Sequence, residues 1–204
     1  MSYHHGQLAP ALVAAGLALA RAGGTDAVTL REATRAVGVT PRAAYRHFEN
    51  RQALVDAVAC AAHGHLADVI TSHQERIGST GDQRAGDVLR AVGSGYVEFA
   101  RTEPGWFDVA FFGLEDMLLA SSPQAVGRAG RTPFQQLEDA VAGLVEAGAL
   151  AADQSESAAI FCWSTVHGFA VLASKGPLRG LGPYVDELSR EVIERAVDGT
   201  LSRR

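Results

Sequence analysis

The amino-acid sequence predicts an all-α protein, and three observations support this prediction. Apolar residues recur at helical spacing in several segments, first at Leu8, Leu12, Ala15 and Leu19. Valine, isoleucine and threonine do not cluster into the alternating runs that are typical of strands. Glycine and proline separate the apolar segments, as they do between helices. Together these patterns predict roughly nine helices.

The boundaries of the first two helices are marked by glycine and by a capping pattern. Gly23 and Gly24 are expected to end the first helix, because glycine readily adopts the left-handed conformation found there. Thr29 and Glu32 have the spacing of a capping box, in which a threonine side chain accepts from the third amide of a helix. Gly38 is then expected to end a short helix over residues 30–37.

A third short helix is expected over residues 41–48. Thr40 stands where an N-cap is needed, and Pro41 suits the first helical position because that amide has no helical partner. Asn50 is expected to cap a fourth, longer helix that extends to about Leu66.

The rest of the chain is also expected to be helical, with other residues marking the helix ends. Asp153 and Glu156 are expected to cap a strongly apolar helix that reaches about Ser174, and a Gly/Pro linker follows over 176–183. The other helical segments are expected around 89–99, 106–112, 134–144 and 185–196.

Charge is distributed unevenly along the 204 residues. The first 60 residues hold six arginines and four acidic residues, which gives this part a net charge of +2. Because the whole chain has a net charge of −5, residues 61–204 have a net charge of −7. A mildly basic N-terminal part joined to an acidic body suits a DNA-reading module fused to a larger domain. We therefore expect a DNA-binding domain over 1–60 and a second domain over 61–204.

Several classes of protein are disfavoured by the sequence. Cys60 and Cys162 are far apart, as expected of reduced core residues in a cytoplasmic protein. We expect no signal peptide, no membrane span and no cofactor, because the required patterns are missing. The hydrolase, nucleotide-binding and metalloprotease motifs are also missing, and Lys175 is the only lysine, so we do not expect an enzyme. His63, His65 and His73 are interpreted as a solvated helix face rather than a metal site.

The strongest functional pattern is two short helices joined by a glycine turn over residues 29–48. Such a pair, with its second helix exposed, is the helix-turn-helix that inserts a helix into the major groove of DNA. On the second helix Ala44 and Phe48 fall on the side that can pack against the first helix. Arg42, Ala43, Arg46 and His47 then point outward, where arginines can reach guanine edges or phosphates.

Residues 29–48, followed by Asn-Arg-Gln-Ala-Leu54, closely resemble the DNA-binding domain of the TetR family. The opening Tyr3-His-His-Gly6 and the pattern Trp163-x-x-x-His167-Gly168 resemble one branch of that family, which has a Trp/His/Gly pattern in its C-terminal domain. The resemblance implies base contacts from Pro41, Arg42 and Ala43. It implies phosphate contacts from Tyr45, His47 and Arg51. The residues expected to bind DNA are Thr29, Thr40, Pro41, Arg42, Ala43, Tyr45, Arg46, His47 and Arg51.

The resemblance also implies a ligand-responsive regulator, most often a repressor that a small apolar effector releases from palindromic operator DNA. Aromatic residues between 96 and 172 suit either an ordinary core or an effector chamber. His167 and Glu138 are the candidate polar anchors, although a lone histidine is more often a core residue. The candidate effector residues are Phe99, Trp106, Phe107, Phe111, Phe134, Glu138, Trp163 and His167.

A homodimer is expected through residues 155–172 and 184–198. The helix over 158–173 is apolar almost all round, so a second subunit is a natural source of cover. Two reading heads about 34–36 Å apart also match two half-sites of a palindrome. The alternatives are a helical small-molecule-binding protein or an enzyme, in either case without DNA-binding activity.

Overall fold

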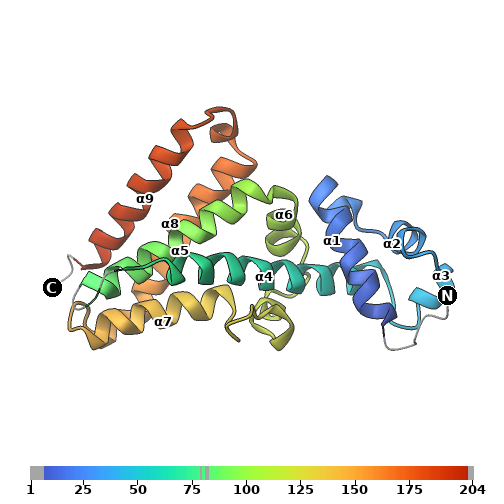
Figure 1. Cartoon of the computed structure of the whole chain (residues 1–204), viewed down its shortest axis with the longest axis horizontal. Helices are drawn as coiled ribbons and strands as arrows, with labels where there is room; N and C mark the ends of the chain where they lie inside the picture. The colour runs from blue at the N-terminus through green and yellow to red at the C-terminus, as the bar shows by residue number, and fades with distance from the viewer. Residues whose placement is uncertain (1–6, 79, 81–82, 202–204) are drawn as a thin grey trace. The chain divides into compact units, whose positions relative to one another are not determined.

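The structure, a computed structural model, describes residues 7–78, 80 and 83–201. Within these residues there are nine α-helices, four short 3₁₀ helices and no strand, which confirms the all-α prediction (Figure 1). The opening Tyr3-His-His-Gly6 pattern lies outside the described residues. The α-helices are α1 (Leu8–Ala27), α2 (Leu30–Val37), α3 (Pro41–Ala44), α4 (Arg51–Glu75), α5 (Gln83–Thr102), α6 (Pro104–Phe112), α7 (Pro133–Glu146), α8 (Ser155–Ser174) and α9 (Tyr184–Leu201). The 3₁₀ helices are η1 (Met117–Ser121), η2 (Pro123–Ala125), η3 (Ala152–Gln154) and η4 (Pro177–Gly180).

The chain forms two compact units, divided differently from the expected boundary at residue 60. The first unit comprises the residues up to His65 together with Glu103–Val126, and the second comprises Leu66–Thr102 and Gly127–Arg204. The difference arises because α6 packs against α1, so that a segment from the middle of the chain joins the N-terminal unit.

The first unit has its core between α1, α2, α3, α6 and the beginning of α4. Leu12 on α1 and Leu54 on α4 are fully buried there, and Phe48 packs against the same cluster. A Cβ at Gly16 would come within 2.4 Å of a Val58 methyl carbon, so α1 and α4 meet closely at that glycine. This core supports the two short helices α2 and α3.

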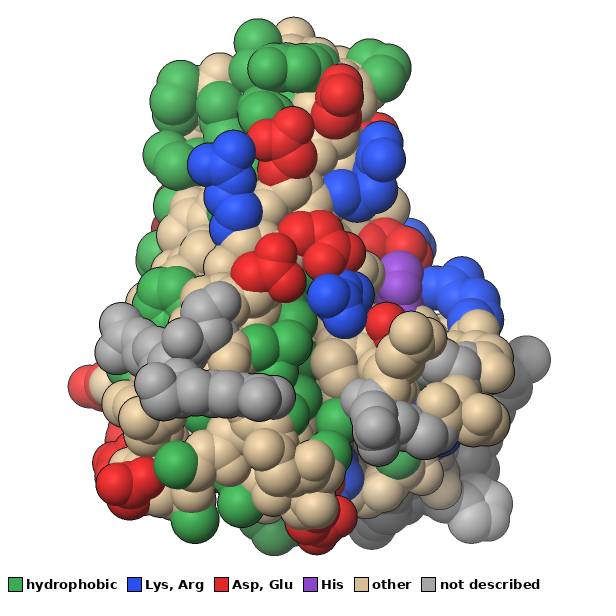
Figure 2. Space-filling model, turned by 90° about the vertical axis from the view of Figure 1, so that its left-hand side faces the viewer, with side chains coloured by type: hydrophobic (Ala, Val, Ile, Leu, Met, Phe, Trp, Pro, Cys, Tyr) green, Lys and Arg blue, Asp and Glu red, His purple; other side chains and the backbone are tan. Residues whose placement is uncertain are grey.

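The second unit is built from α5, α7, α8, α9 and the end of α4. Helix α5 packs against α7, α8 and α9, and α8 packs against both α7 and α9. Phe99, Leu144 and Phe169 are buried in this unit. One face of the protein carries intermingled acidic and basic side chains, and hydrophobic side chains gather at its upper end (Figure 2).

Several helix boundaries follow the sequence-based predictions. The Thr29 hydroxyl accepts a hydrogen bond from the Glu32 amide at 3.2 Å, and Gly38 ends α2 with a φ of 76°. Asn50 accepts from the Ala53 amide at 2.9 Å at the beginning of α4. In α1 the helical geometry is interrupted at Gly23 and Gly24, and one more turn follows.

Two local predictions are wrong. The α-helical part of α3 ends at Ala44, not Phe48, because the amides of Arg46 and His47 bond three residues back, to Ala43 and Ala44, in a tighter turn. Asp153 and Glu156 do not form a capping box, because Asp153 lies in η3, Gln154 precedes α8 and no side chain caps this helix.

Within the part of the chain that the structure describes, three helical segments are long and apolar enough to cross a membrane by length and composition: Leu8–Ala27, Arg51–Glu75 and Ala152–Ser174. This criterion is one of length and composition alone, and polar or glycine residues interrupt each segment, so the absence of a membrane span stays a prediction. In the structure these helices use apolar residues for packing, and α4 is the most deeply buried of the three.

Candidate nucleic-acid interface and aromatic cluster

The outer surface of α3 and of the turn after it is polar and exposed. Arg42, Tyr45, Arg46 and His47 are all exposed, and the Tyr45 side chain is 57% accessible. On the inner side Ala44 is fully buried and Phe48 is 7% exposed. The segment thus presents two guanidinium groups, an imidazole and a phenol outward, anchored from behind by two apolar residues.

Thr40, Pro41 and Ala43 complete this surface with small side chains. Thr40 and Pro41 are exposed and Ala43 is half-buried. Thr40 has the extended backbone of an N-cap, but its hydroxyl makes no cap hydrogen bond, unlike that of Thr29. These short side chains leave room for another molecule to approach the backbone of α3.

Arg51 makes contacts within the first unit that the sequence did not indicate. Its Nε donates to the Val28 carbonyl at 2.8 Å, and its Nη2 donates to the Thr25 carbonyl at 2.7 Å. Both carbonyls lie at the C-terminal end of α1, and the Thr25 carbonyl also accepts from the Val28 amide at 3.1 Å. The Arg51 guanidinium therefore caps α1, and its remaining N–H groups are the ones available for an anion.

In the second unit, the structure brings three predicted effector residues together. The ring centres of Phe134 and Trp163 lie 5.6 Å apart in a T-shaped arrangement. The Trp163 ring centre also lies 6.0 Å from that of His167, which follows Trp163 by one turn of α8. The Tyr96 hydroxyl lies 2.7 Å from Nδ1 of His167. Phe99, also on α5, is completely buried. We call Tyr96, Phe134, Trp163 and His167 the aromatic cluster.

Burial keeps the polar groups of the aromatic cluster uncharged. Burial raises the pKa of Tyr96 far above its usual value, and a hydrogen bond from Trp163 only partly opposes this. Burial also lowers the pKa of His167, which favours the neutral imidazole. The Tyr96 O–H therefore donates to an unprotonated Nδ1. This arrangement suits a largely apolar partner better than an ion.

The other predicted effector residues lie elsewhere. Trp106, Phe107 and Phe111 belong to the first unit, where the Trp106 indole N–H donates to the Leu17 carbonyl at 2.8 Å and Phe107 lies 4.8 Å from Phe111. Glu138 is exposed on α7, which does not support a role as a buried polar anchor.

The three histidines considered above have three different surroundings. His63 is 3% exposed and its Nε2 donates to the Ala110 carbonyl at 2.9 Å, so interpreting this residue as part of a solvated face was wrong. Its four-residue spacing from the buried Val55 and Ala59 on α4 was the signal for burial. His65 stacks on Trp106 at 4.7 Å, and His73 lies 2.8 Å from Glu98. No group of three or more His, Cys, Asp or Glu side chains in the described part of the chain could hold a metal ion.

Family models match two separate parts of the chain. Residues 12–58 match the model described as bacterial regulatory proteins of the tetR family, and residues 89–196 match that of a tetracyclin repressor-like C-terminal domain. No curated protein sequence matches the chain. The first match covers the helix-turn-helix, and the second includes all of the aromatic cluster.

Solved structures share the fold over nearly the whole chain. A Rhodococcus sp. RHA1 protein of unknown function is 27% identical, with a TM-score of 0.74 over 99% of this chain and 100% of its own. A tetR-family regulatory protein from Rhodococcus RHA1 is 18% identical, with a TM-score of 0.64 over 95% and 97%. The transcriptional regulator FadR from Bacillus subtilis is 13% identical, with a TM-score of 0.66 over 93% and 98%. The chain therefore belongs to the TetR family of bacterial regulatory proteins, with a helix-turn-helix near its N-terminus and a tetracyclin repressor-like C-terminal domain.

Proposed function

We propose that this protein is a cytoplasmic transcriptional repressor that binds a palindromic operator as a homodimer and that a small, largely apolar effector releases it. The observation that carries the proposal is the exposed set Arg42, Tyr45, Arg46 and His47, anchored by the buried Ala44 and Phe48. In a family of regulatory proteins such a set supports insertion of the α3 segment into a major groove.

The exposed side chains of the α3 segment are assigned to DNA bases or to phosphates according to their positions. Arg42 lies on α3, next to the small Pro41 and Ala43, and a guanidinium there can bond both O6 and N7 of a guanine. Tyr45, Arg46 and His47 follow on the turn and suit phosphate oxygens. Arg51 can add one phosphate contact through the N–H groups that do not cap α1.

The dimer interface is proposed on α8 and α9, as expected from the sequence. A stripe on α8 carries Ile160 and Leu172, which are 46% and 45% exposed, with Ser164 and Gly168 between them. These residues recur about every four positions, so they share one helix face, and the small residues allow close approach of a second helix. An exposed apolar stripe on a helix supports burial against a second copy.

The effector is proposed to bind beside the aromatic cluster in the second unit. The Tyr96–His167 hydrogen bond and the Trp163 indole place a few polar groups among aromatic rings, which is the composition of many small-molecule sites. The FadR structure was solved in complex with stearoyl-CoA, which supports a capacity of this fold for apolar chains. Ligand binding would favour one dimer geometry over another and so change the spacing of the two reading heads.

A mobility-shift experiment tests the proposal against the alternative of a helical binding protein or enzyme without DNA-binding activity. The purified chain is mixed with DNA from beside its own gene and with unrelated DNA of the same length. We expect a shift of the first DNA at concentrations that leave the second unshifted. Equal binding of both DNAs at moderate salt, or binding of neither, would contradict the proposal that this protein is a DNA-binding transcriptional regulator.

A further inference from the structure

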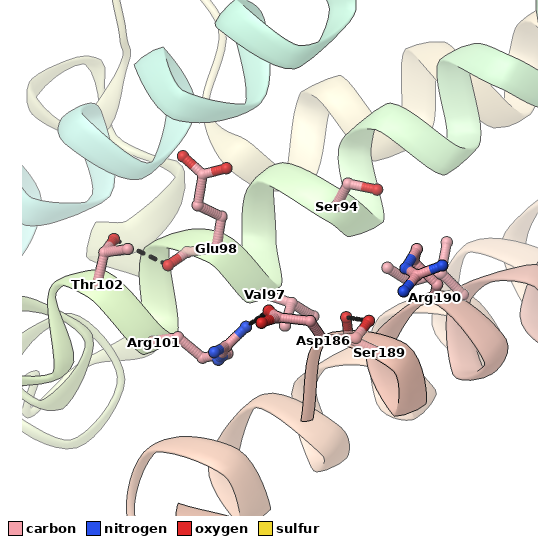
Figure 3. A pocket seen from close by; sticks show the side chains of 9 residues that line it. Ser94, Val97, Glu98, Arg101, Thr102, Asp186, Ser189 and Arg190 are labelled. Carbon is pink, nitrogen blue, oxygen red and sulfur yellow. Dashed lines mark hydrogen bonds and ion pairs between the residues drawn. The ribbon is translucent and has the colours of Figure 1, made fainter. Parts of the chain in front are cut away.

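A cleft of about 490 Å³ lies between α5 and α9 within the second unit (Figure 3). Each wall is one face of a helix, because Ser94, Val97 and Arg101 recur at helical spacing on α5, as do Asp186, Arg190 and Ile193 on α9. A Cβ at Gly93 would lie 3.3 Å from the Ile193 side chain, so the helices approach closely there. The volume is in the range of small-molecule sites, about 300–1,000 Å³.

Most of the charged groups at the cleft are already paired. Arg101 forms an ion pair with Asp186 across the cleft, as Figure 3 shows. Glu98 lies 2.8 Å from Nε2 of His73, which comes from the end of α4. The hydroxyl of Ser189 donates to the backbone carbonyl of Asp186 at 2.9 Å. Among the described residues, Arg190 is the charged side chain of this cleft that has no ion-pair partner.

We propose that the α5–α9 cleft binds a small organic monocarboxylate, with the Arg190 guanidinium holding the carboxylate. A guanidinium offers parallel N–H groups that match the two oxygens of a carboxylate. Ser94, on the opposite wall, can add a hydroxyl donor. Val97 and Ile193, which are 3% and 5% exposed, form an apolar floor for a short hydrocarbon chain.

Charge decides between a carboxylate and a phosphate in this cleft. Arg101 offsets the charge of Asp186, but the Glu98 carboxylate also lines the cleft without an arginine partner among the described residues, and repulsion from it grows with the charge of an anionic ligand. A monoanion gains the contact with Arg190 at a smaller repulsive cost than a phosphate dianion. This site goes beyond the proposed function, since it lies apart from the aromatic cluster and needs no DNA.

Calorimetric titration of the full chain with sodium butyrate tests the site, with butyramide as an uncharged ligand of the same shape. We expect saturable binding of butyrate and at least tenfold weaker binding of butyramide. Arg190→Gln should weaken butyrate binding by about tenfold, because a charge-assisted pair is lost. Arg131→Gln is the matched control, since Arg131 is an exposed arginine of the second unit outside the cleft lining and outside the proposed dimer helices, and it should leave binding unchanged.

A second variant, Ser94→Phe, keeps every charge and fills the cleft, and it should also abolish butyrate binding. The proposal is overturned if butyrate does not bind, or if it binds equally well to Arg190→Gln. It is also overturned if Arg190→Gln shifts only the monomer–dimer equilibrium, because Arg190 would then belong to a subunit interface. Loss of operator binding with intact butyrate binding would count against the proposed function alone.

Discussion

The carboxylate of Asp108 on α6 accepts two hydrogen bonds from Thr25, one from the backbone amide at 2.6 Å and one from the hydroxyl at 2.7 Å. Thr25 follows Gly24, whose φ of 68° redirects the chain at the end of α1. Trp106, on the same helix as Asp108, donates to the Leu17 carbonyl at 2.8 Å. These contacts hold helix α6 against α1, within the unit that also contains the helix-turn-helix.

Asp108→Ala should destabilise the first unit by about 1–3 kcal/mol, because a partly buried amide and hydroxyl of Thr25 lose their acceptor. Urea unfolding followed by circular dichroism measures the change. Asp139→Ala is the control, since Asp139 forms an exposed ion pair with Arg131, and such pairs contribute about 0–1 kcal/mol. Equal losses in the two variants would show that the Asp108 contacts do not hold α1.

His63 should make stability depend on pH. Burial lowers its pKa from 6.5 to about 4, so between these values the unfolded chain binds more protons than the folded chain. Stability should therefore be complete above pH 6.5 and fall as the pH drops toward 4, by up to about 3 kcal/mol. His63→Gln keeps a donor for the Ala110 carbonyl but does not titrate, so the slope between pH 6.5 and 4 should become shallower. An unchanged slope would contradict the assignment.

Arg51→Lys should separate the two roles of Arg51. A lysine keeps the positive charge but cannot match the planar guanidinium that reaches the carbonyls of both Val28 and Thr25. We expect a loss of about 1 kcal/mol in unfolding free energy with nearly unchanged affinity for non-specific DNA. Arg46→Lys, at an exposed position, should leave stability unchanged. A stable Arg51→Lys variant with weakened DNA binding would show that the phosphate role dominates.

Ile160→Asp should dissociate the proposed dimer. Each subunit would bury a charge in place of an apolar side chain, and twofold symmetry doubles a cost of about 1.5–3 kcal/mol. Light scattering coupled to size exclusion should show a dimer for the native chain and a monomer for the variant. Leu118→Asp is the control, since Leu118 is 78% exposed in the first unit and should leave the dimer intact. A dimeric Ile160→Asp variant would move the interface away from the α8 stripe.

The parts of the fold that were predictable from the sequence are those that local chemistry determines. The cap at Thr29 and the left-handed Gly38 depend on neighbouring residues alone, and both were predicted. The exposed Arg42 and the buried Phe48 follow from helical spacing over a few residues, although the helix itself is shorter than expected.

The parts that were missed depend on residues far apart in the chain. Asp108 and Thr25 are 83 positions apart, and no periodicity in either segment indicates their pairing. The capping of α1 by Arg51 could not be predicted from the sequence either, since the carbonyl that Arg51 binds lies 23 positions earlier. An arginine near the start of a helix has the same local sequence pattern whether it binds carbonyls or phosphates. The aromatic residues were recognised as a group, but their division between two units depends on how α6 folds back.

The most direct test of the account measures the affinity of Arg42→Ala for operator DNA and for unrelated DNA by fluorescence anisotropy. Arg131→Ala serves as the control, since Arg131 is exposed and lies before α7, outside both the α3 segment and the proposed dimer helices α8 and α9. If Arg42 reads bases from a major groove, the variant should lose about 1–3 kcal/mol on the operator and much less on unrelated DNA. Unchanged operator affinity, or an equal loss on both DNAs, would contradict base reading by the α3 segment.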